Sequence, residues 1–375
     1  PHHSTILSIK DPALYPPQAP LHPVNSQRSM QDFLPEYRPL LVLAPMQDVT
    51  DLPFMRVMER FGGPDVYVTE YFRVYENSRL KPYILRSIDE NPTGKPVFAQ
   101  MIGQDIPSLV RSSRELEEHP VAGVDLNLGC PAPVVCRKDA GGGLLRKPAK
   151  VDRILGELRQ TIRGRFTVKT RVGYETPEEF DELLDVFSRH QIDALAIHGR
   201  TVKERYQSPI HPHCIQRAVE ALSCPVIANG NIVDVDTGRA AAALSGAAGL
   251  MMGRGAIRNP WLFEQLRASY SKRPVPAPTG CDLLSYIEQL WEETAREQVK
   301  VYRADRQVHK MKRYLAYITQ GLDEEFDHEI LRASKEEEFF QICRGHLSHK
   351  NPLPERPQET SRRFCGFLEL LRTCV

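Results

Sequence analysis

The sequence predicts a (β/α)₈ TIM barrel followed by a C-terminal helical-bundle domain. Between residues 40 and 252, eight short apolar runs alternate with stretches whose apolar residues recur every three or four positions. Strands that alternate with helices predict βαβ units and a parallel sheet. Eight units within roughly 220 residues fit a closed barrel better than a doubly wound sheet. Beyond residue 280 the helical pattern continues with few Gly or Pro residues, which predicts a separate bundle.

Each predicted strand is a short run rich in β-branched or other apolar residues that stops near a polar residue, Gly or Pro. The predicted strands cover residues 41–44, 66–69, 97–100, 124–127, 166–169, 194–197, 225–228 and 249–252. The segments between them, such as 151–162 and 178–190, carry the apolar stripe expected of helices that cover a barrel.

Changes in composition set the expected domain boundaries. Residues 1–36 are rich in Pro, Ser, His and Gln without periodicity, so we expect a flexible leader. The barrel domain should then span 37–265. A Pro-rich linker is expected at 266–280, and the helical domain at 281–375.

The composition excludes several functional classes. A formal net charge of +1 gives no overall attraction to nucleic acid, so any RNA-binding surface must be local. The 8 cysteines include no Cys-X-X-Cys pair, which argues against a zinc ribbon, and reduced thiols indicate the cytoplasm. The cluster His211-Pro-His213-Cys214 lacks further ligands at zinc-site spacing, so no metal is expected. No run approaches the ~20 apolar residues of a membrane span.

Nearly every predicted strand ends in a residue that can bind or react. The carboxyl ends of barrel strands meet in one ring, where barrel enzymes hold their reactive groups. Polar groups buried without partners are costly, so a purely structural explanation of this ring is weak. The candidates are Pro45, Met46, Gln47, Glu70, Gln100, Asn127, Cys130, Lys169, Arg171, His198, Arg200, Asn229, Gly230, Asn231, Gly253 and Arg254.

The last two strand ends indicate a phosphate site. Residues 229–231 and 253–254 follow the seventh and eighth strands, where barrels commonly hold a phosphate against backbone N–H groups. Arg254 can neutralise the charge of that phosphate. With Lys169 and Gln100 in the same ring, FMN fits. Lys169 can stabilise charge on the N1/C2 edge of a reduced flavin, and Gln100 can bond the amide edge of its ring.

Cys130 lies in the segment Asp125-Leu-Asn-Leu-Gly-Cys-Pro131, just after an apolar run. A run that stops at Gly and Pro predicts a buried strand feeding a loop, which is where a barrel places reactive groups. A free cysteine is nevertheless more often a small buried apolar residue. The local motif alone leaves both interpretations open.

Six motifs in one order carry a resemblance to a known family. They are Leu43-Ala-Pro-Met-Gln-Asp-Val-Thr-Asp51, Asn127-Leu-Gly-Cys-Pro131, Val168-Lys-Thr-Arg171, Ile197-His-Gly-Arg-Thr201, Ala228-Asn-Gly-Asn231 and Met252-Gly-Arg254. Together they resemble the tRNA-dihydrouridine synthases, flavoenzymes that reduce a uridine of RNA to 5,6-dihydrouridine. The resemblance covers residues 40–263 closely and the helical part more loosely. It departs from the family at 141–145, where three Gly residues stand in place of the usual Gly-Ala pair.

The resemblance implies a role for each matching residue. Cys130 would give a proton to C5 of uracil while hydride passes from FMN to C6, and NADPH would reduce the flavin. Asn127 would contact the uracil edge, and Arg171 and Arg200 are candidate substrate-binding residues. The implied FMN site consists of Pro45, Met46, Gln47, Gln100, Lys169, His198, Asn229, Gly230, Asn231, Gly253 and Arg254. The target uridine would have to leave its stack to reach the flavin.

A cationic stripe is expected on the helical domain. Arg303, Arg306, Lys310 and Arg313 recur at three- and four-residue steps, which places them on one helix face. Acidic residues are sparse on that face, and the family places an RNA-recognition bundle here. We therefore expect the stripe to contact tRNA phosphates. A merely solvated charged face is the alternative.

Two other functions fit part of this pattern. An FMN barrel dehydrogenase of a small molecule, similar to dihydroorotate dehydrogenase, would share the pocket but would need neither the helical extension nor the stripe. A dihydrouridine synthase acting on ribosomal RNA would share every motif. The sequence leaves open the modified position and the choice between NADPH and NADH, and we expect a monomer.

Overall fold

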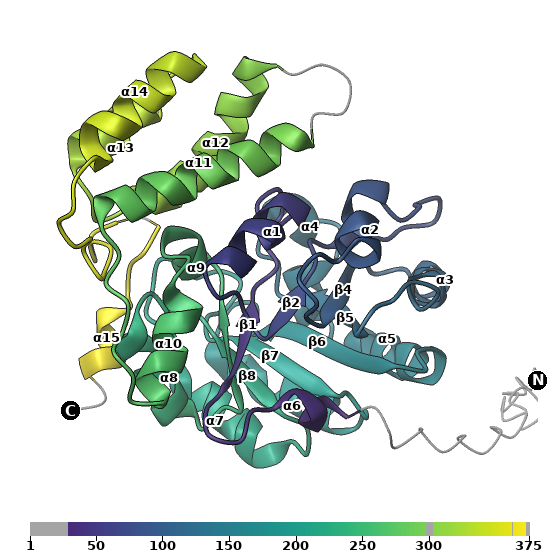
Figure 1. Cartoon of the computed structure of the whole chain (residues 1–375). Coiled ribbons are helices and arrows are strands. Elements are labelled where there is room, and N and C mark those ends of the chain that lie inside the picture. Colours follow the sequence, from purple (N-terminus) through teal and green to yellow (C-terminus); the bar gives the residue numbers. More distant parts are fainter. Residues whose placement is uncertain (1–28, 298–302, 362, 373–375) are drawn as a thin grey trace, which may run out of the picture.

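The computed structural model describes residues 29–297, 303–361 and 363–372 and contains a closed parallel barrel (Figure 1). Its strands are β1 (Leu40–Leu43), β2 (Val66–Val68), β3 (Phe72–Arg73), β4 (Val97–Ile102), β5 (Gly123–Leu128), β6 (Arg165–Arg171), β7 (Ala194–His198), β8 (Val226–Asn229) and β9 (Gly249–Met252). Pairing runs from β2 through β1 and β9 to β4, and the β2–β4 pairing closes the ring. The predicted fold class is confirmed, and all eight predicted strands are present, with short β3 added.

The strand register sets which side chains share a level in the barrel. Asn127 of β5 pairs with Lys169 of β6. Near the carboxyl ends of their strands, Arg171 pairs with His198, and His198 pairs with Asn229. Residues from four successive strands therefore meet at the same end of the barrel, as the ring of polar strand ends predicts.

Helices between the strands cover the outside of the barrel. They are α1 (Leu52–Arg60), α2 (Pro82–Asp89), α3 (Ile106–Leu116), α4 (Pro133–Cys136), α5 (Pro148–Thr161), α6 (Phe180–Ser188), α7 (Pro212–Ala221), α8 (Val235–Ser245), α9 (Arg254–Arg258) and α10 (Leu262–Tyr270). Side-chain caps fix several of their starts. Asp51 caps α1 by accepting the N–H of Phe54, and Asp234 forms a capping box with Thr237 at the start of α8.

The end of the predicted leader closes the amino-terminal end of the barrel. A 3₁₀ turn, Met30–Phe33, buries Met30 in the lower barrel core, and the ring of Phe33 packs edge-on against Phe98 at 6.2 Å. Arg165 pairs with Asp32 at 2.8 Å. Residues 29–36 therefore belong to the barrel, because their apolar side chains cover its open base. The rest of the predicted leader, 1–28, lies outside the described residues.

The helical domain lies above the barrel in Figure 1. It consists of α11 (Gly280–Arg296), α12 (Ala304–Ile318), α13 (Glu324–Ile330) and α14 (Glu336–Leu347). Helix α11 packs against α1, and α12 packs against α9. The connection from the barrel is shorter than the predicted 266–280, because α10 continues to Tyr270 and α11 already begins at Gly280. None of the described helices combines the length and apolar character needed to cross a membrane.

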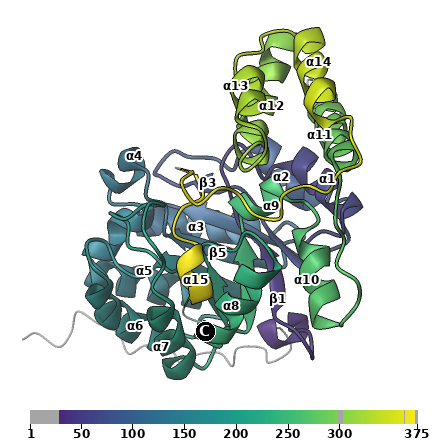
Figure 2. The same ribbon diagram turned by 90° about the vertical axis from the view of Figure 1, so that its left-hand side faces the viewer.

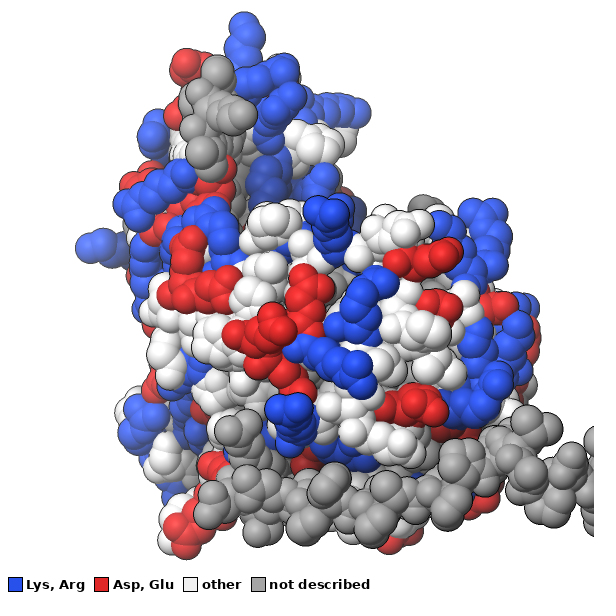
Figure 3. All heavy atoms as spheres, turned by 90° about the vertical axis from the view of Figure 1, so that its right-hand side faces the viewer, with Lys and Arg blue, Asp and Glu red and all other residues white. Residues whose placement is uncertain are grey.

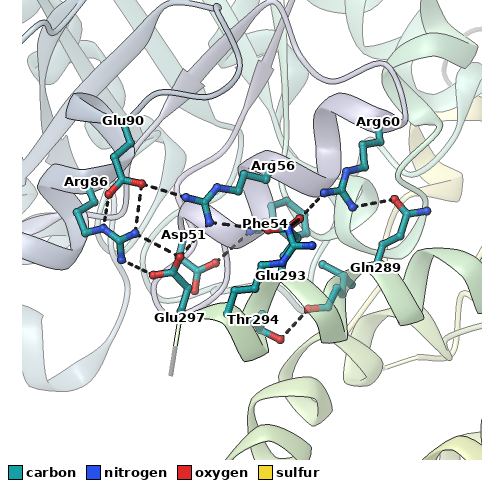
Figure 4. Close-up of polar contacts among 12 residues, drawn as sticks. Asp51, Phe54, Arg56, Arg60, Arg86, Glu90, Gln289, Glu293, Thr294 and Glu297 are labelled. Atoms are coloured by element: carbon teal, nitrogen blue, oxygen red, sulfur yellow. Dashed lines mark hydrogen bonds and ion pairs between the residues drawn. The ribbon is translucent and has the colours of Figure 1, made fainter. Parts of the chain in front are cut away.

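Ion pairs join the barrel to α11 (Figure 4). Glu293 of α11 is almost fully buried, and Arg56 and Arg60 of α1 and Arg296 of its own helix surround its carboxylate. At the end of the helix, Glu297 pairs with Arg56 at 2.9 Å. A buried carboxylate is tolerated only where its charge is compensated. These pairs therefore fix how α11 sits on α1.

After α14 the chain turns back to the barrel. Figure 2 shows the C-terminal segment descending from the helical domain across the barrel to α15 (Leu368–Arg372), which packs against α8. The predicted helical domain at 281–375 is therefore too long. Its helices end at Leu347, and the described residues after 350 pack largely on the barrel.

Candidate active site

A pocket of about 620 Å³ opens at the carboxyl ends of the barrel strands. That volume lies in the range of cofactor and small-molecule sites. Among the predicted site residues, the pocket is lined by Pro45, Met46, Gln47, Asn127, Cys130, Lys169, Arg171, His198, Asn229, Gly230, Asn231, Gly253 and Arg254. Gln100 and Arg200 do not line it, and the four cations of the predicted stripe lie on or beside α12.

Asn127 holds the loop that carries Cys130. Its Oδ1 accepts the backbone N–H groups of Gly129 at 3.0 Å and of Cys130 at 2.9 Å. Its Nδ2 donates to Gln100 Oε1 at 2.8 Å. Gly141 presses against the other side of the loop, where an added Cβ would come within 3.1 Å of the Cys130 Cβ. The Cys130 thiol therefore lies at the pocket wall, on a loop that Asn127 and Gly141 hold in place from two sides.

Gln100 belongs to a buried network beneath the pocket, which differs from its predicted contact with the flavin ring. Its Nε2 donates to Asp125 Oδ2 at 2.7 Å, and Thr167 donates to Asp125 Oδ1 at 2.6 Å. Burial raises the pKa of Asp125 to about 6. Both polar ends of Gln100 are occupied by protein groups, so it supports Asn127 and, through Asn127, the loop of Cys130.

The pocket wall is cationic. Lys169, Arg171, Arg205, Arg254 and Arg363 line it, and within the described part of the chain no Asp or Glu does. Burial, and then the nearby charge of Arg171, lowers the pKa of Lys169 to about 8. Burial also lowers the pKa values of Arg171 and Arg254. Cations concentrated in a partly desolvated pocket favour an anionic ligand.

Several buried polar atoms at the pocket have no hydrogen-bond partner among the described residues. They are Gln47 Oε1, His198 Nδ1 and Asn231 Nδ2. Burial, and then the charges around it, holds the pKa of His198 well below its usual range, so its imidazole is neutral at pH 7. Buried polar atoms are seldom left unpaired, so these three indicate a polar ligand.

Arg171 and Arg200 hold loops together. Arg171 donates to the carbonyl groups of Gly129 at 2.9 Å and of Thr201 at 2.8 Å. Arg200 is fully buried and donates to Asn231 Oδ1 at 2.9 Å. Arg171 still lines the pocket, whereas Arg200 orients Asn231 from behind. The predicted contact of Arg171 with substrate stays a prediction. The predicted contact of Arg200 with substrate has no support, because Arg200 does not line the pocket.

Two of the predicted stripe cations bind the barrel. Lys310 pairs with Asp51 at 2.7 Å and also donates to the carbonyl group of Asp48, and Arg313 pairs with Asp48 at 3.2 Å. Arg303 precedes α12 and pairs with Asp305. The pattern along the helix cannot indicate these partners of Lys310 and Arg313, because both carboxylates lie on the loop after β1, far away in the sequence. Only Arg306 of this set is exposed and has no ion pair within the described residues.

Four aromatic or cationic residues at the pocket have no clear signal of their own in the sequence. They are Tyr71, Tyr317, Arg363 and Phe364. Tyr71 directly follows Glu70 at a predicted strand end, which is a usable signal. The other three come from α12 and from the C-terminal tail, where no strand end marks them.

The side chains of the His211-Pro-His213-Cys214 segment make separate contacts. His211 pairs with Glu204, and His213 contacts Cys214 at 3.3 Å. In the described part of the chain, no group of three or more His, Cys, Asp or Glu residues is arranged to hold a metal ion.

The motifs and the barrel site agree with a comparison to known families. Residues 42–350 match the family model of dihydrouridine synthases. The chain belongs to the dihydrouridine synthase family. The resemblance predicted from the six motifs is therefore confirmed, and with it the expectation of an enzyme.

Individual members of this family show the same relationship. The chain is 32% identical to a tRNA-dihydrouridine(16) synthase of Ralstonia nicotianae over 67% of this chain and 80% of that one. It is 32% identical to a probable tRNA-dihydrouridine synthase 2 of Bacillus subtilis over 71% of this chain and 82% of that one. It is 30% identical to a tRNA-dihydrouridine(16) synthase of Pseudomonas putida over 76% of this chain and 89% of that one.

Proposed function

We propose that this dihydrouridine synthase reduces a uridine of tRNA to 5,6-dihydrouridine, with FMN as its cofactor and NADPH as the reductant. One observation carries the proposal. The Cys130 thiol and a wall of cations, with no carboxylate among the described lining residues, share the pocket at the mouth of the barrel. The relatives named as tRNA-dihydrouridine synthases supply the substrate class.

The pocket fits a phosphorylated flavin. Lys169, Arg254 and the backbone around Gly230 offer positive charge and donors, and the unpaired atoms of Gln47 and Asn231 need polar partners. Gly230 has a φ of 121°, a conformation that favours glycine, and the absence of a side chain there lets a ligand come close to the backbone. When bound, FMN supplies the hydride for the uracil ring.

The protein groups supply the proton and the positioning. The Cys130 thiol lines the pocket and carries a transferable proton, which suits it as the donor to C5. Asn127 and Gly141 fix the loop of that thiol, and neutral His198 can donate or accept a hydrogen bond at the pocket wall without adding charge. The extruded base would enter between these groups, out of contact with bulk water.

The function is tested by mapping dihydrouridine in RNA from a deletion strain before and after complementation. We expect one tRNA position to lose the modification in the deletion strain and to regain it with the intact gene. Position 16, which the names of the relatives from Ralstonia nicotianae and Pseudomonas putida print, is the first to check. Loss confined to ribosomal RNA, or no loss at all, would contradict the proposal.

The cofactor gives a second prediction. The purified protein should be yellow, and acid should release FMN. Arg254→Ala should raise the dissociation constant of FMN roughly tenfold to a hundredfold, since it removes a charged donor facing the pocket. Arg239→Ala is the matched control, because Arg239 is exposed on α8 and does not line the pocket. Release of FAD, or no flavin binding after reconstitution, would refute the cofactor assignment.

A third prediction concerns tRNA. Lys and Arg side chains gather at the top of the face in Figure 3, on the helical domain, whereas positively and negatively charged side chains are interspersed over the barrel below. Arg306→Gln should weaken tRNA binding and lower the log–log salt slope by roughly one, because one phosphate contact is lost. Lys310→Gln, one turn away, should chiefly lower stability by about 1 kcal/mol, since its partner is Asp51.

Filter binding of tRNA between 50 and 200 mM salt, together with thermal unfolding, separates the two variants. An unchanged tRNA affinity of Arg306→Gln at every salt concentration would show that its side chain is merely solvated. It would also leave the helical domain without an RNA contact on this face.

A further inference from the structure

The C-terminal tail reaches the pocket from outside the part of the chain that matches the family model, which ends at residue 350. The barrel anchors the tail along its path in Figure 2. Arg258 donates to the carbonyl groups of Pro354 at 2.8 Å and of Glu355 at 3.1 Å. Arg356 pairs with Asp234 at the start of α8. The chain then reaches the pocket, which Arg363 and Phe364 line.

At the pocket, the tail binds Arg254 and Arg200, the two arginines next to the predicted phosphate site. Arg254 donates to the carbonyl group of Arg363, and its guanidinium lies 5.6 Å from the centre of the Phe364 ring. Arg200, which orients Asn231, donates to the carbonyl group of Cys365 at 3.0 Å. The guanidinium groups of Arg254, which lines the pocket, and of Arg200, which lies behind it, thus use backbone acceptors of the tail, and among the described residues no carboxylate pairs with either of them.

The tail is pressed closely against the loop after β7. Cys365 Sγ donates to the carbonyl group of Tyr206 at 3.1 Å. Gly366 has a φ of 78°, and an added Cβ there would lie 2.7 Å from the carbonyl oxygen of Ser208. A residue with a side chain would be strained and would collide with the loop, so this turn requires glycine. The tail is therefore built for one conformation at this point.

We propose that the C-terminal tail is part of the cofactor site: it closes the phosphate end of the pocket, positions Arg254, and thereby controls retention of the phosphate-bearing cofactor. This inference rests on the proposed function, because it takes the pocket ligand to be FMN. A tail that served only to cover the barrel would need its apolar contacts. It would not need the backbone acceptors that it gives to Arg254 and Arg200.

The tail offers a matched pair of variants. Phe364 and Phe367 are 2% and 1% exposed and pack in the same apolar cluster with Val233. Only Phe364 lines the pocket and lies over Arg254. Replacing either ring with leucine removes a similar amount of buried surface and keeps the cluster apolar. The two variants should therefore lose similar stability and differ only in their effect on the pocket.

The experiment titrates FMN into flavin-free full-length protein and follows flavin fluorescence, with thermal unfolding of the same flavin-free samples. Phe364→Leu should raise the FMN dissociation constant about tenfold, whereas Phe367→Leu should leave it within about twofold of the wild type. Both should lower Tm by similar amounts. Gly366→Ala, which displaces the tail without touching an aromatic ring, should weaken FMN binding as Phe364→Leu does.

Equal FMN affinity in Phe364→Leu, Phe367→Leu and the wild type would overturn the role of the tail, and so would an equal loss in both phenylalanine variants. Gly366→Ala with wild-type affinity would also count against it. If the wild type itself fails to bind FMN, the proposed function fails, and this outcome is distinct from the others.

Discussion

Cys130→Ala is expected to lower the rate of dihydrouridine formation by a factor on the order of 10²–10⁴, the usual cost of losing a well-placed general acid. FMN binding and NADPH oxidation should stay close to those of the wild type. The reason lies in the hydrogen bonds around the loop. Asn127 binds the backbone N–H of Cys130, and Gly142 donates to its carbonyl group, so alanine preserves both contacts. The substitution therefore removes the proton donor and leaves the conformation of the loop unchanged.

Single-turnover reduction of tRNA by pre-reduced enzyme measures the step directly. Cys136→Ala is the control, because Cys136 is buried, does not line the pocket, and donates only to the carbonyl group of Cys130 at 3.4 Å. It should retain activity within a few-fold of the wild type. Normal turnover by Cys130→Ala together with loss of turnover in Cys136→Ala would show that Cys136 is the proton donor.

The sequence predicts the barrel well because its signal is local. Each strand is a short apolar run, and the side chains that follow it fall at one end of the sheet by geometry alone. Gln100 shows the limit of this argument. The local pattern predicts a strand end at Gln100, but β4 continues to Ile102, so Gln100 lies within the strand. Its side chain therefore joins the buried network with Asp125 and Asn127.

Long-range pairing explains the other differences. In α12, the apolar residues Val308, Met311 and Leu315 recur at three- and four-residue steps and are buried, so periodicity alone indicates which face of this helix packs inward. The sequence of the helix could not reveal that Lys310 meets Asp51, since that carboxylate lies in the first barrel loop. The sequence could not predict that Phe364 lines the pocket either. A single aromatic residue in a Pro-rich tail has no periodic pattern to indicate which surface it covers.

A buried acid that contacts the same first loop should limit stability through its titration. Glu70 follows β2, is 3% exposed, and accepts the backbone N–H of Asp48. Burial, and then the charge of Asp51, raises the pKa of Glu70 to about 7 from a usual value of 4.5, although Lys310 opposes the shift. The folded protein thus binds this proton more tightly than the unfolded chain. The resulting stability is full below pH 4.5 and is lost as the pH rises through 7.

Glu70→Gln is therefore expected to stabilise the protein at pH 8, by up to roughly 3 kcal/mol, from about 1.4 kcal/mol for each unit of pKa shift. Glutamine cannot ionise, and its Oε1 can still accept the N–H of Asp48. Urea unfolding of both proteins measures the difference, which should be small at pH 5 and larger at pH 8. Glu76→Gln, on the exposed segment after β3, is the control and should show no pH-dependent difference.

A Glu70→Gln variant that is less stable than the wild type at pH 8 would mean that the ionised carboxylate is held by Lys310. In that case the contact between α12 and the first loop would depend on the charge of Glu70 as well as on that of Asp51.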